Sequence, residues 1–221
     1  MKAEMRQIIA GLFLLAGIAA SSIAGATVIN GQIANFDGDR DGMADDLKIA
    51  RVTFNVTAGT RVFFDTMVFE SDFATLKDLN GDGQITGFDS YMMLFDAAGT
   101  NLFYADDSNA TFGDGSVNTM DAARSWTFSQ AGTYMITIGQ GTSFQHEALQ
   151  GFEKNTPLEQ FIGEQNFAAW RLTMSATGGT LSQVAEVGVP AADVPEPASL
   201  LLLGAGLAGF AASRRKKNPS A

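Results

Sequence analysis

The sequence predicts an all-β fold, an antiparallel β-sandwich of the jelly-roll type, and three observations lead to this prediction. Residues 133–138 and 167–174 alternate apolar and polar side chains with a period of two, as half-buried strands do. Several short segments rich in β-branched and aromatic residues end at glycine-containing turns. The chain has no cysteine and 17 phenylalanines, so an ordinary apolar core must stabilise the domain.

Strands are expected along the whole body, in chain order at residues 49–56, 61–69, 91–95, 102–104, 125–128, 133–138 and 167–174. Only a short glycine-containing turn separates the first two, which predicts a β-hairpin. Residues 156–165 are expected to form a short helix capped by Thr156. Residues 177–193, rich in Gly, Ala and Val, are interpreted as a spacer, which leaves residues 27–176 to the sandwich.

The N-terminus has the pattern of a secretory signal helix. A basic start precedes the apolar run 8–20, and the small residues Ala24 and Ala26 fit the pocket of a signal peptidase. We expect cleavage after Ala26, so that residues 1–26 are a signal peptide and the mature chain begins at Thr27. A buried N-terminal helix is the alternative, and it would leave the basic start and the small-residue step unexplained.

The C-terminus carries a second apolar segment. Residues 198–212 contain no charge, and as a helix they would reach about 22 Å, short of a hydrocarbon core of about 30 Å. Long basic side chains behind the run can extend to the headgroups. We therefore expect a transmembrane helix over 198–213 with its basic end in the cytoplasm. Four consecutive cations argue against a core helix: Arg214, Arg215, Lys216 and Lys217.

The charge of the body excludes one class of partner. The chain has 14 basic and 24 acidic residues, and the two terminal segments contain six of the basic and two of the acidic ones. Residues 27–193 therefore carry 8 basic and 22 acidic residues, a net charge of −14. Such a surface repels nucleic acid and attracts cations, so we expect no nucleic-acid partner.

An acidic segment in the middle of the body has the spacing of a calcium-binding loop. Asp78, Asn80 and Asp82 offer oxygen ligands at the first, third and fifth positions, and a glycine follows at the sixth. The carbonyl group of Gln84 and the carboxylate of Asp89 would supply the seventh and twelfth positions. The residues after Asp89 have a strand pattern, so the loop does not belong to a helix–loop–helix hand.

A second loop near the N-terminus repeats this acidic core. Its twelfth position holds Lys48, so a closing ligand must come from Asp45, Asp46 or elsewhere. For both loops the alternative is a solvated turn, because Asp and Gly favour turns without any metal. The candidate calcium ligands of this second loop are Asp37, Asp39, Asp41 and Asp45.

The body shows no catalytic pattern. His146 is the only histidine, and its place beside Glu147 in a polar segment is typical of a surface residue. A Ser-His-Asp site would have to use it, and no Gly-x-Ser-x-Gly turn is present. Carboxylate pairs are abundant, but none can be singled out by a distinct environment. We therefore expect a protein that is not an enzyme.

The tail resembles the PEP-CTERM sorting signal of Gram-negative bacteria. The resemblance covers residues 194–217, with the motif Val194, Pro195, Glu196 and Pro197, the apolar span and the basic cluster. It implies export, transient anchoring in the inner membrane and cleavage near Pro-Glu-Pro by an exosortase. It also implies a final place at the cell surface or in an extracellular matrix with exopolysaccharide. A eukaryotic lipid-anchor signal would end in apolar residues instead.

The body is similar to secreted β-sandwich domains related to bacterial pre-peptidase C-terminal domains, through residues 56–60, 88–96, 106–107 and 131–134. That similarity implies an accessory or binding module. Two functions follow: a structural component of the surface or matrix with calcium-stabilised loops, or a carbohydrate-binding module with exposed aromatic residues on one sheet face. Trp126 and Trp170 lie in strand patterns that fit the core equally well, so the first function is preferred.

Overall fold

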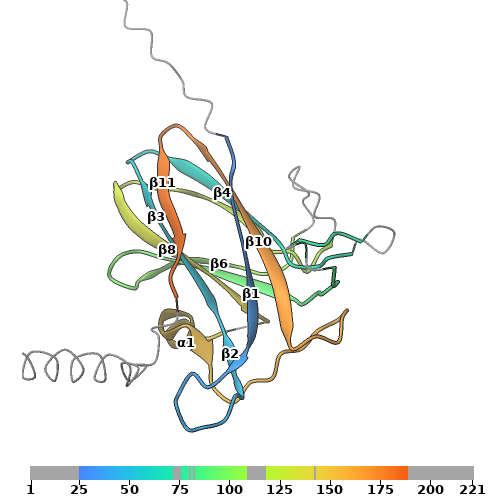
Figure 1. Ribbon diagram of the computed structural model, residues 1–221. Helices are drawn as coiled ribbons and strands as arrows, with labels where there is room; N and C mark the ends of the chain where they lie inside the picture. Colours follow the sequence, from blue (N-terminus) through green and yellow to red (C-terminus); the bar gives the residue numbers. More distant parts are fainter. Residues whose placement is uncertain are drawn as a thin grey trace, which may run out of the picture.

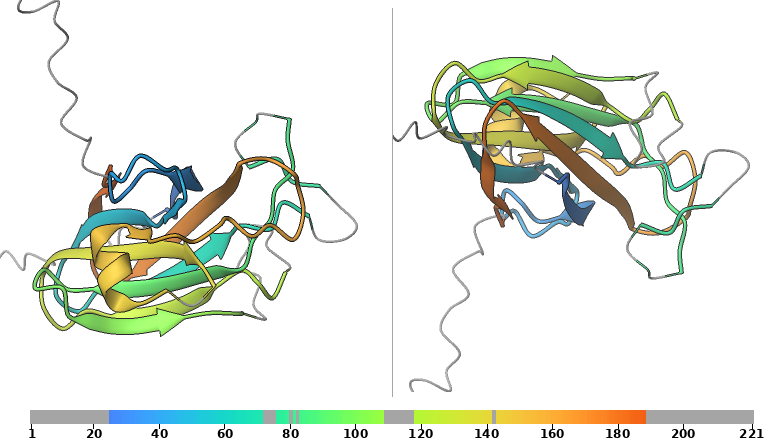
Figure 2. Two further views of the ribbon diagram at one scale, coloured as in Figure 1. Left: turned by 90° about the horizontal axis from the view of Figure 1, so that it is seen from below. Right: turned by 90° about the horizontal axis from the view of Figure 1, so that it is seen from above.

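The computed structural model describes residues 25–71, 76–79, 81, 83–108, 118–141 and 143–188. These residues form two antiparallel sheets that lie face to face, together with one short helix (Figure 1, Figure 2). The predicted antiparallel β-sandwich is therefore confirmed. The predicted signal helix and the predicted transmembrane helix at 198–213 lie outside the described residues.

Each sheet combines strands from distant parts of the chain. The six-stranded sheet has the order β7-β4-β10-β1-β2-β9 and the five-stranded sheet the order β11-β3-β8-β5-β6. The first consists of β1 (Thr27–Phe36), β2 (Asp46–Lys48), β4 (Arg61–Met67), β7 (Ala123–Thr127), β9 (Phe152–Glu153) and β10 (Phe167–Thr177). The second consists of β3 (Ala50–Val56), β5 (Ser90–Phe95), β6 (Asn101–Ala105), β8 (Gly132–Gln140) and β11 (Leu181–Glu186).

The core lies between the sheets and is rich in aromatic rings. Alternate residues of β3 are buried, as the period-two pattern requires. Phe54 of β3 and Phe64 of β4 meet across the sandwich with ring centroids 5.5 Å apart. Trp170 of β10 is fully buried and packs on Gly31, where an added Cβ would lie 2.3 Å from the indole ring. The absence of a side chain at Gly31 is what admits the tryptophan.

A second, smaller apolar cluster lies on the outer face of the five-stranded sheet. All six residues of β5 are buried, because inward side chains enter the main core and the outward ones pack against the helix α1 (Gln145–Gln150). The outward residues are Tyr91, Met93 and Phe95, and Ala148 of α1 covers them. The helix ends at Gly151, whose amide donates to the carbonyl of Glu147 at 2.7 Å.

The predicted hairpin between residues 49–56 and 61–69 is wrong. β3 pairs with β8 and β11, whereas β4 pairs with β10 and β7 in the other sheet. Both strands have apolar residues that face one core, so the chain crosses between sheets at the turn. The crossing is fixed by hydrogen bonds from Gly59 N to Phe128 O at 2.7 Å and from Thr57 N to Thr180 O at 3.2 Å.

The predicted helix at residues 156–165 is also wrong, and α1 forms instead at Gln145–Gln150. The Thr156 hydroxyl donates to Lys154 O rather than capping a helix. The segment that follows runs beside Gly87, with a bridge to Ile162 and a hydrogen bond from Phe161 N to Gly87 O at 2.7 Å. Backbone pairing with a neighbouring segment replaces the local hydrogen bonds of a helix.

The interpretation of residues 177–193 as a spacer fails for part of that segment. β11 pairs with the edge of β3, and its Leu181 and Val184 pack against the main core. The pattern is hard to read because β11 contains a bulge and buries few residues. The folded body thus continues past residue 176, and Val187 N still donates to Arg51 O at 2.7 Å.

The two ends of the described chain leave the sandwich at different places. β1 begins at Thr27, the first residue of the predicted mature chain, and pairs there with Met174 of β10. In Figure 1 this end lies at the top, and the chain leaves after β11 at the level of α1. No helix in the described ranges is long and apolar enough to span a bilayer.

Candidate functional site

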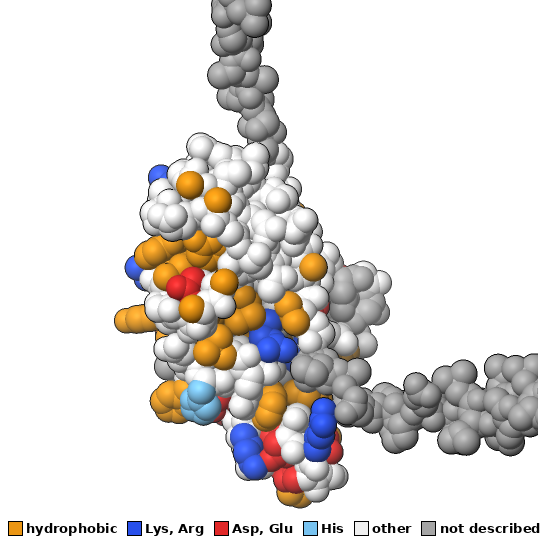
Figure 3. Space-filling view, turned by 90° about the vertical axis from the view of Figure 1, so that its left-hand side faces the viewer, with side chains coloured by type: hydrophobic (Ala, Val, Ile, Leu, Met, Phe, Trp, Pro, Cys, Tyr) orange, Lys and Arg blue, Asp and Glu red, His pale blue; other side chains and the backbone are white. Residues whose placement is uncertain are grey.

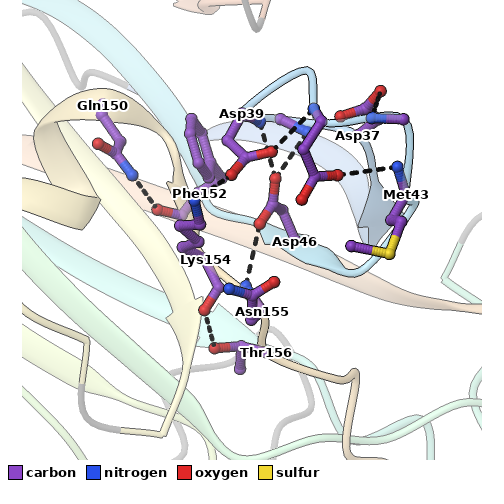
Figure 4. A network of polar contacts seen from close by, with 12 residues as sticks. Asp37, Asp39, Met43, Asp46, Gln150, Phe152, Lys154, Asn155 and Thr156 are labelled. Atoms are coloured by element: carbon purple, nitrogen blue, oxygen red, sulfur yellow. Dashed lines mark hydrogen bonds and ion pairs between the residues drawn. The ribbon is translucent and has the colours of Figure 1, made fainter.

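The β1–β2 acidic loop, residues 37–46, is built around one buried carboxylate (Figure 4). Asp46 is fully buried at the start of β2. Its Oδ2 accepts hydrogen bonds from Gly38 N at 2.9 Å and Asp39 N at 2.8 Å. Its Oδ1 accepts one from Asn155 N at 3.0 Å. Asp46 therefore ties the loop to itself and to the segment after β9.

Two of the predicted ligands, Asp37 and Asp39, lie with Asp46 in one carboxylate cluster. One oxygen from each of the three lies within 4.8 Å of the others. Lys154 forms an ion pair with Asp39, and its hydrogen bond is the largest cause of the lowered pKa of that carboxyl group. This cluster therefore already contains a cation and several amide donors.

The other two predicted ligands of this loop stay outside the cluster. Asp41 is exposed and accepts a hydrogen bond from Met43 N at 2.9 Å. Asp45 is half-buried, and burial, followed by the charges of Asp41 and Asp46, raises its pKa. Lys48, at the twelfth position, points to β11 and pairs with Glu186 at 2.7 Å. Figure 3 shows the resulting mixture of acidic and basic side chains at the lower end, where Figure 1 places β2.

The second predicted calcium loop is described in part, because Asn80 and Asp82 lie outside the described residues. Asp78 accepts hydrogen bonds from Gly81 N and Gly83 N, each at 2.7 Å. Gln84 follows as an exposed residue. The N–H of the sixth-position glycine thus bonds to the first-position aspartate, as it does in the β1–β2 acidic loop from Gly42 to Asp37 at 3.1 Å. Both glycines have positive φ angles, 79° and 94°.

A buried glutamate that the sequence did not indicate supports this second loop. Glu70 is 1% exposed and follows β4. Its carboxylate accepts hydrogen bonds from Leu79 N at 2.7 Å and Thr86 N at 2.6 Å. The Thr86 hydroxyl donates to it as well, at 2.8 Å. Nothing in the sequence pattern indicated that this glutamate, three residues after an apolar strand, would be buried and accept hydrogen bonds from the loop.

Asp89, the predicted closing ligand of the second loop, belongs to another carboxylate group. It lies with Asp106 and Asp107, and one oxygen from each is within 4.8 Å of the others. We name these three residues the β6 acidic end. Burial, followed by the charges of Asp107 and Asp106, raises the pKa of Asp89 to about 6. Strands were predicted at both β5 and β6, and an antiparallel pairing of these two neighbours would have placed Asp89 close to Asp106 and Asp107.

An exposed aromatic ring lies beside the β6 acidic end. Tyr104 of β6 is 60% exposed and stacks on Tyr91 of β5, with centroids 6.0 Å apart and an interplanar angle of 19°. Burial, and then the neighbouring Tyr104 and Asp106, raise the pKa of Tyr91. Neither tryptophan is exposed in this way: Trp170 is fully buried, and Trp126 is half-buried and packs on Phe103 with ring centroids 5.9 Å apart.

A shallow groove of about 500 Å³ lies farther along the outer face of the five-stranded sheet. Met135 of β8 and Leu149 of α1 contribute apolar surface to it. Within the described part of the chain, the one carboxylate that lines the groove belongs to Asp96. The Oδ1 atom of Asp96 accepts hydrogen bonds from the amides of Ala98 and Thr100, each at 2.9 Å. The Thr100 amide is the main cause of the lowered pKa of Asp96. This groove therefore presents no free acid–base pair.

The only histidine lies on the surface. His146 is exposed in α1 and stacks on Phe144, with centroids 6.0 Å apart. The neighbouring Glu147 accepts a hydrogen bond from Phe144 N at 2.7 Å. His146 is thus placed as expected of a surface side chain.

Comparison with known proteins identifies the tail. Residues 193–216 match the model of the PEP-CTERM protein-sorting motif, so this prediction is confirmed. The chain is an exported, surface-sorted protein of the Gram-negative type, and the motif implies that an exosortase recognises it. The sorting residues 194–217 and the cleavage residue Ala24 lie outside the described part of the chain, whereas Ala26 is described and exposed.

The other comparisons concern the body. A search of curated proteins found no match. Among solved structures, the chain is similar to PliG of Aeromonas hydrophila, a periplasmic lysozyme inhibitor of g-type lysozyme, with 13% identity and a TM-score of 0.34. The similarity covers 69% of this chain and 86% of PliG. At this TM-score it carries no argument about function, and the similarity to pre-peptidase C-terminal-like domains stays a hypothesis.

Proposed function

We propose that this protein is a non-catalytic structural component of the cell surface or of an exopolysaccharide matrix. The observation that carries the proposal is the sorting motif placed directly behind a folded sandwich: the described body ends at Gly188 and the motif begins at residue 193. The whole sandwich is thus the part delivered to the surface. The inner membrane is its transient site before the exosortase acts.

The described surface supports a non-catalytic role. His146 stacks on an exposed phenylalanine, and the acid in the outer groove accepts amides of its own turn. A general acid–base pair needs two groups whose environments separate their pKa values around one reacting centre. Asp89, whose pKa is raised to about 6, lies beside two further carboxylates, Asp106 and Asp107, instead.

We also propose that Ca²⁺ stabilises the two acidic loops. The support is the hydrogen bond that both loops share, from a sixth-position glycine with positive φ to a first-position aspartate. This bond turns each loop back on itself, so the oxygen atoms at alternate positions can converge on one cation. The proposed ligands come from Asp37, Asp39 and Asp46 in one loop, and from Asp78, Asn80 and Asp82 in the other.

Processing of the tail tests the sorting proposal. Mass spectrometry of the protein from native cells should give a mature form that begins at Thr27 and ends close to Glu196. Pro-Glu-Pro cannot readily continue a helix, so it presents an extended segment to a protease. Recovery of the intact C-terminus through Ala221 in surface fractions would mean that the tail is a permanent anchor.

Thermal unfolding tests the calcium proposal. The processed protein should melt higher in millimolar Ca²⁺ than in chelator, because an ion that binds only the folded state stabilises it by mass action. Asp78→Ala combined with Asp82→Ala should remove the part of this shift that comes from the second loop, whereas the exposed Glu164→Ala should leave the shift unchanged. Equal melting temperatures of the unmodified protein with and without Ca²⁺ would contradict both loop assignments.

The second candidate function is a carbohydrate-binding module, and one observation favours it. Such a module needs an aromatic ring outside the core, and Tyr104 is 60% exposed on an open sheet face. Among the described residues, the other exposed aromatic side chains are Phe144, at the N-terminal cap of α1, and Phe161, on the segment beside Gly87. Retention of the processed protein by polysaccharide from native cells would support this function.

A further inference from the structure

The stacked tyrosines form a rigid platform on the outer face of the five-stranded sheet. Tyr91 is buried as a member of the small apolar cluster that α1 covers, and Tyr104 stacks on it with most of its own side chain in solvent. Because Tyr104 is already held on one side by Tyr91, its side chain loses little conformational entropy when a ligand covers its exposed side. An exposed aromatic ring on a fixed backbone is therefore a ready contact surface.

The strand that carries this platform is fixed at its edge. Arg124 of β7 donates to Tyr104 O at 2.8 Å, so it bridges the neighbouring edges of the two sheets. Its guanidinium group also lies over the ring of Phe103, 5.4 Å from the centroid. Trp126 packs on the same phenylalanine at 5.9 Å. These contacts position β6 without covering the exposed side of Tyr104.

The charge next to the platform is strongly negative. The three carboxylates of the β6 acidic end follow β6 directly or precede β5 directly, and Asp106 is near enough to Tyr91 to contribute to the raised pKa of its hydroxyl group. Arg124 is the nearby cation, and it is already engaged with Tyr104 O and the Phe103 ring. The surface therefore suits a ligand with one apolar face and positive charge at its edge.

We propose that this face binds a glycan whose sugar rings carry protonated amino groups. The C–H face of one sugar ring packs on Tyr104, which removes apolar surface from water. An ammonium group at the ring edge donates charge-assisted hydrogen bonds to Asp106 and Asp107. A uronic acid polymer would be repelled by the same carboxylates, and a neutral glycan would gain only the stacking contact. The inference rests on the second candidate function and names its site and ligand class.

Calorimetric titration of the processed protein tests the site with two matched probes, glucosamine hexamer and cellohexaose. Both have the same linkage, and only the first carries amino groups. At about pH 6.5, glucosamine hexamer should bind roughly tenfold more tightly, a difference that charge-assisted contacts can supply. Tyr104→Ala should weaken its binding at least about tenfold, whereas Tyr104→Phe keeps the ring and should stay within about threefold.

Two further variants separate the parts of the site. Asp106→Asn with Asp107→Asn should weaken glucosamine hexamer and leave cellohexaose unchanged, because only the ammonium contacts are lost. Phe161→Ala, which removes another exposed ring, should bind as the unmodified protein does. Equal affinity for the two probes, unchanged binding by Tyr104→Ala, or no binding of glucosamine hexamer would overturn the proposal.

The same variants distinguish this inference from the structural role. If Tyr104→Ala loses binding to the hexamer and also leaves the surface fraction of native cells, the glycan site retains the protein there. If unmodified protein stays in the surface fraction but binds neither probe, the glycan proposal is wrong and the structural role stands. Loss of the unmodified protein from that fraction would contradict the structural role alone.

Discussion

The β1–β2 acidic loop and the β6 acidic end each bring three carboxylates together, yet their surroundings are opposite. In the loop, Asp46 accepts three backbone amides and Asp39 pairs with Lys154. At the β6 acidic end, the carboxylates face one another, and burial with mutual repulsion raises the pKa of Asp89 to about 6. The difference shows that the hydrogen-bond donors and cations around a cluster of carboxylates, and not the number of carboxylates in it, decide whether the cluster stabilises or destabilises the fold.

The largest effect is expected from Asp46→Ala. Three amides in a partly buried place would lose their acceptor, which should cost about 3 kcal/mol of unfolding free energy. For a domain of this size that corresponds to a melting temperature lower by about 6–12 °C. Asp41→Ala, which removes an exposed acid from the same loop, is the control and should melt almost as the unmodified protein does. Equal melting temperatures for the two variants would show that Asp46 does not organise the loop.

At the β6 acidic end, removal of a carboxylate is expected to stabilise the protein rather than destabilise it. Asp89 has a pKa of about 6 in the folded protein, above its ordinary 3.8, so the folded state binds the extra proton. Stability should therefore fall as pH rises from about 4 to 6. Asp89→Asn removes this dependence and should raise the melting temperature at pH 7.5 by about 1–3 °C in chelator. A lower melting temperature for this variant at pH 7.5 would contradict the repulsion.

The smallest effect is expected from Lys154→Met. Its partner Asp39 has a lowered pKa, so the pair stabilises the protein above the ordinary pKa of 3.8 and the contribution disappears as pH falls below it. Because the lysine side chain is 58% exposed, the change in melting temperature should be slight. The sharper measurement is the NMR titration of Asp39, whose midpoint should rise in the variant. An unchanged midpoint would mean that Lys154 does not neutralise the loop.

The sequence was informative wherever one strand face is apolar over several residues. The strands β8 and β10 could be predicted because large apolar residues recur at every second position: Tyr134, Ile136 and Ile138 in β8, and Trp170, Leu172 and Met174 in β10. β2 and β9, with three and two residues, are too short for any period to be read. β11 alternates poorly because it covers only an edge of the core, and Gln183 interrupts it with a φ of 52°.

The candidate sites show a similar limit. Spacing along the chain predicted the turn geometry of both acidic loops, since the first aspartate and the sixth glycine act locally. Hydrogen-bond and ion-pair partners that lie far away in the sequence could not be predicted from this spacing. Asn155 reaches Asp46 across 109 residues, and Lys154 comes from the same distant segment. The pairing of β5 and β6, which brings Asp89 to Asp106, is a property of the sheet.

The point beside β3 where the chain leaves the sandwich also limits the distance between the sandwich and the C-terminal tail. Gly188 is the last described residue, and nine residues, 189–197, lead from it through the Pro-Glu-Pro motif. At about 3.3 Å per residue they extend to roughly 30 Å at most. With the tail held in a bilayer, the sandwich cannot move farther from the lipid than this. An exosortase that cleaves at Pro-Glu-Pro would then act close beneath a folded domain, and the released product would keep only a short C-terminal extension.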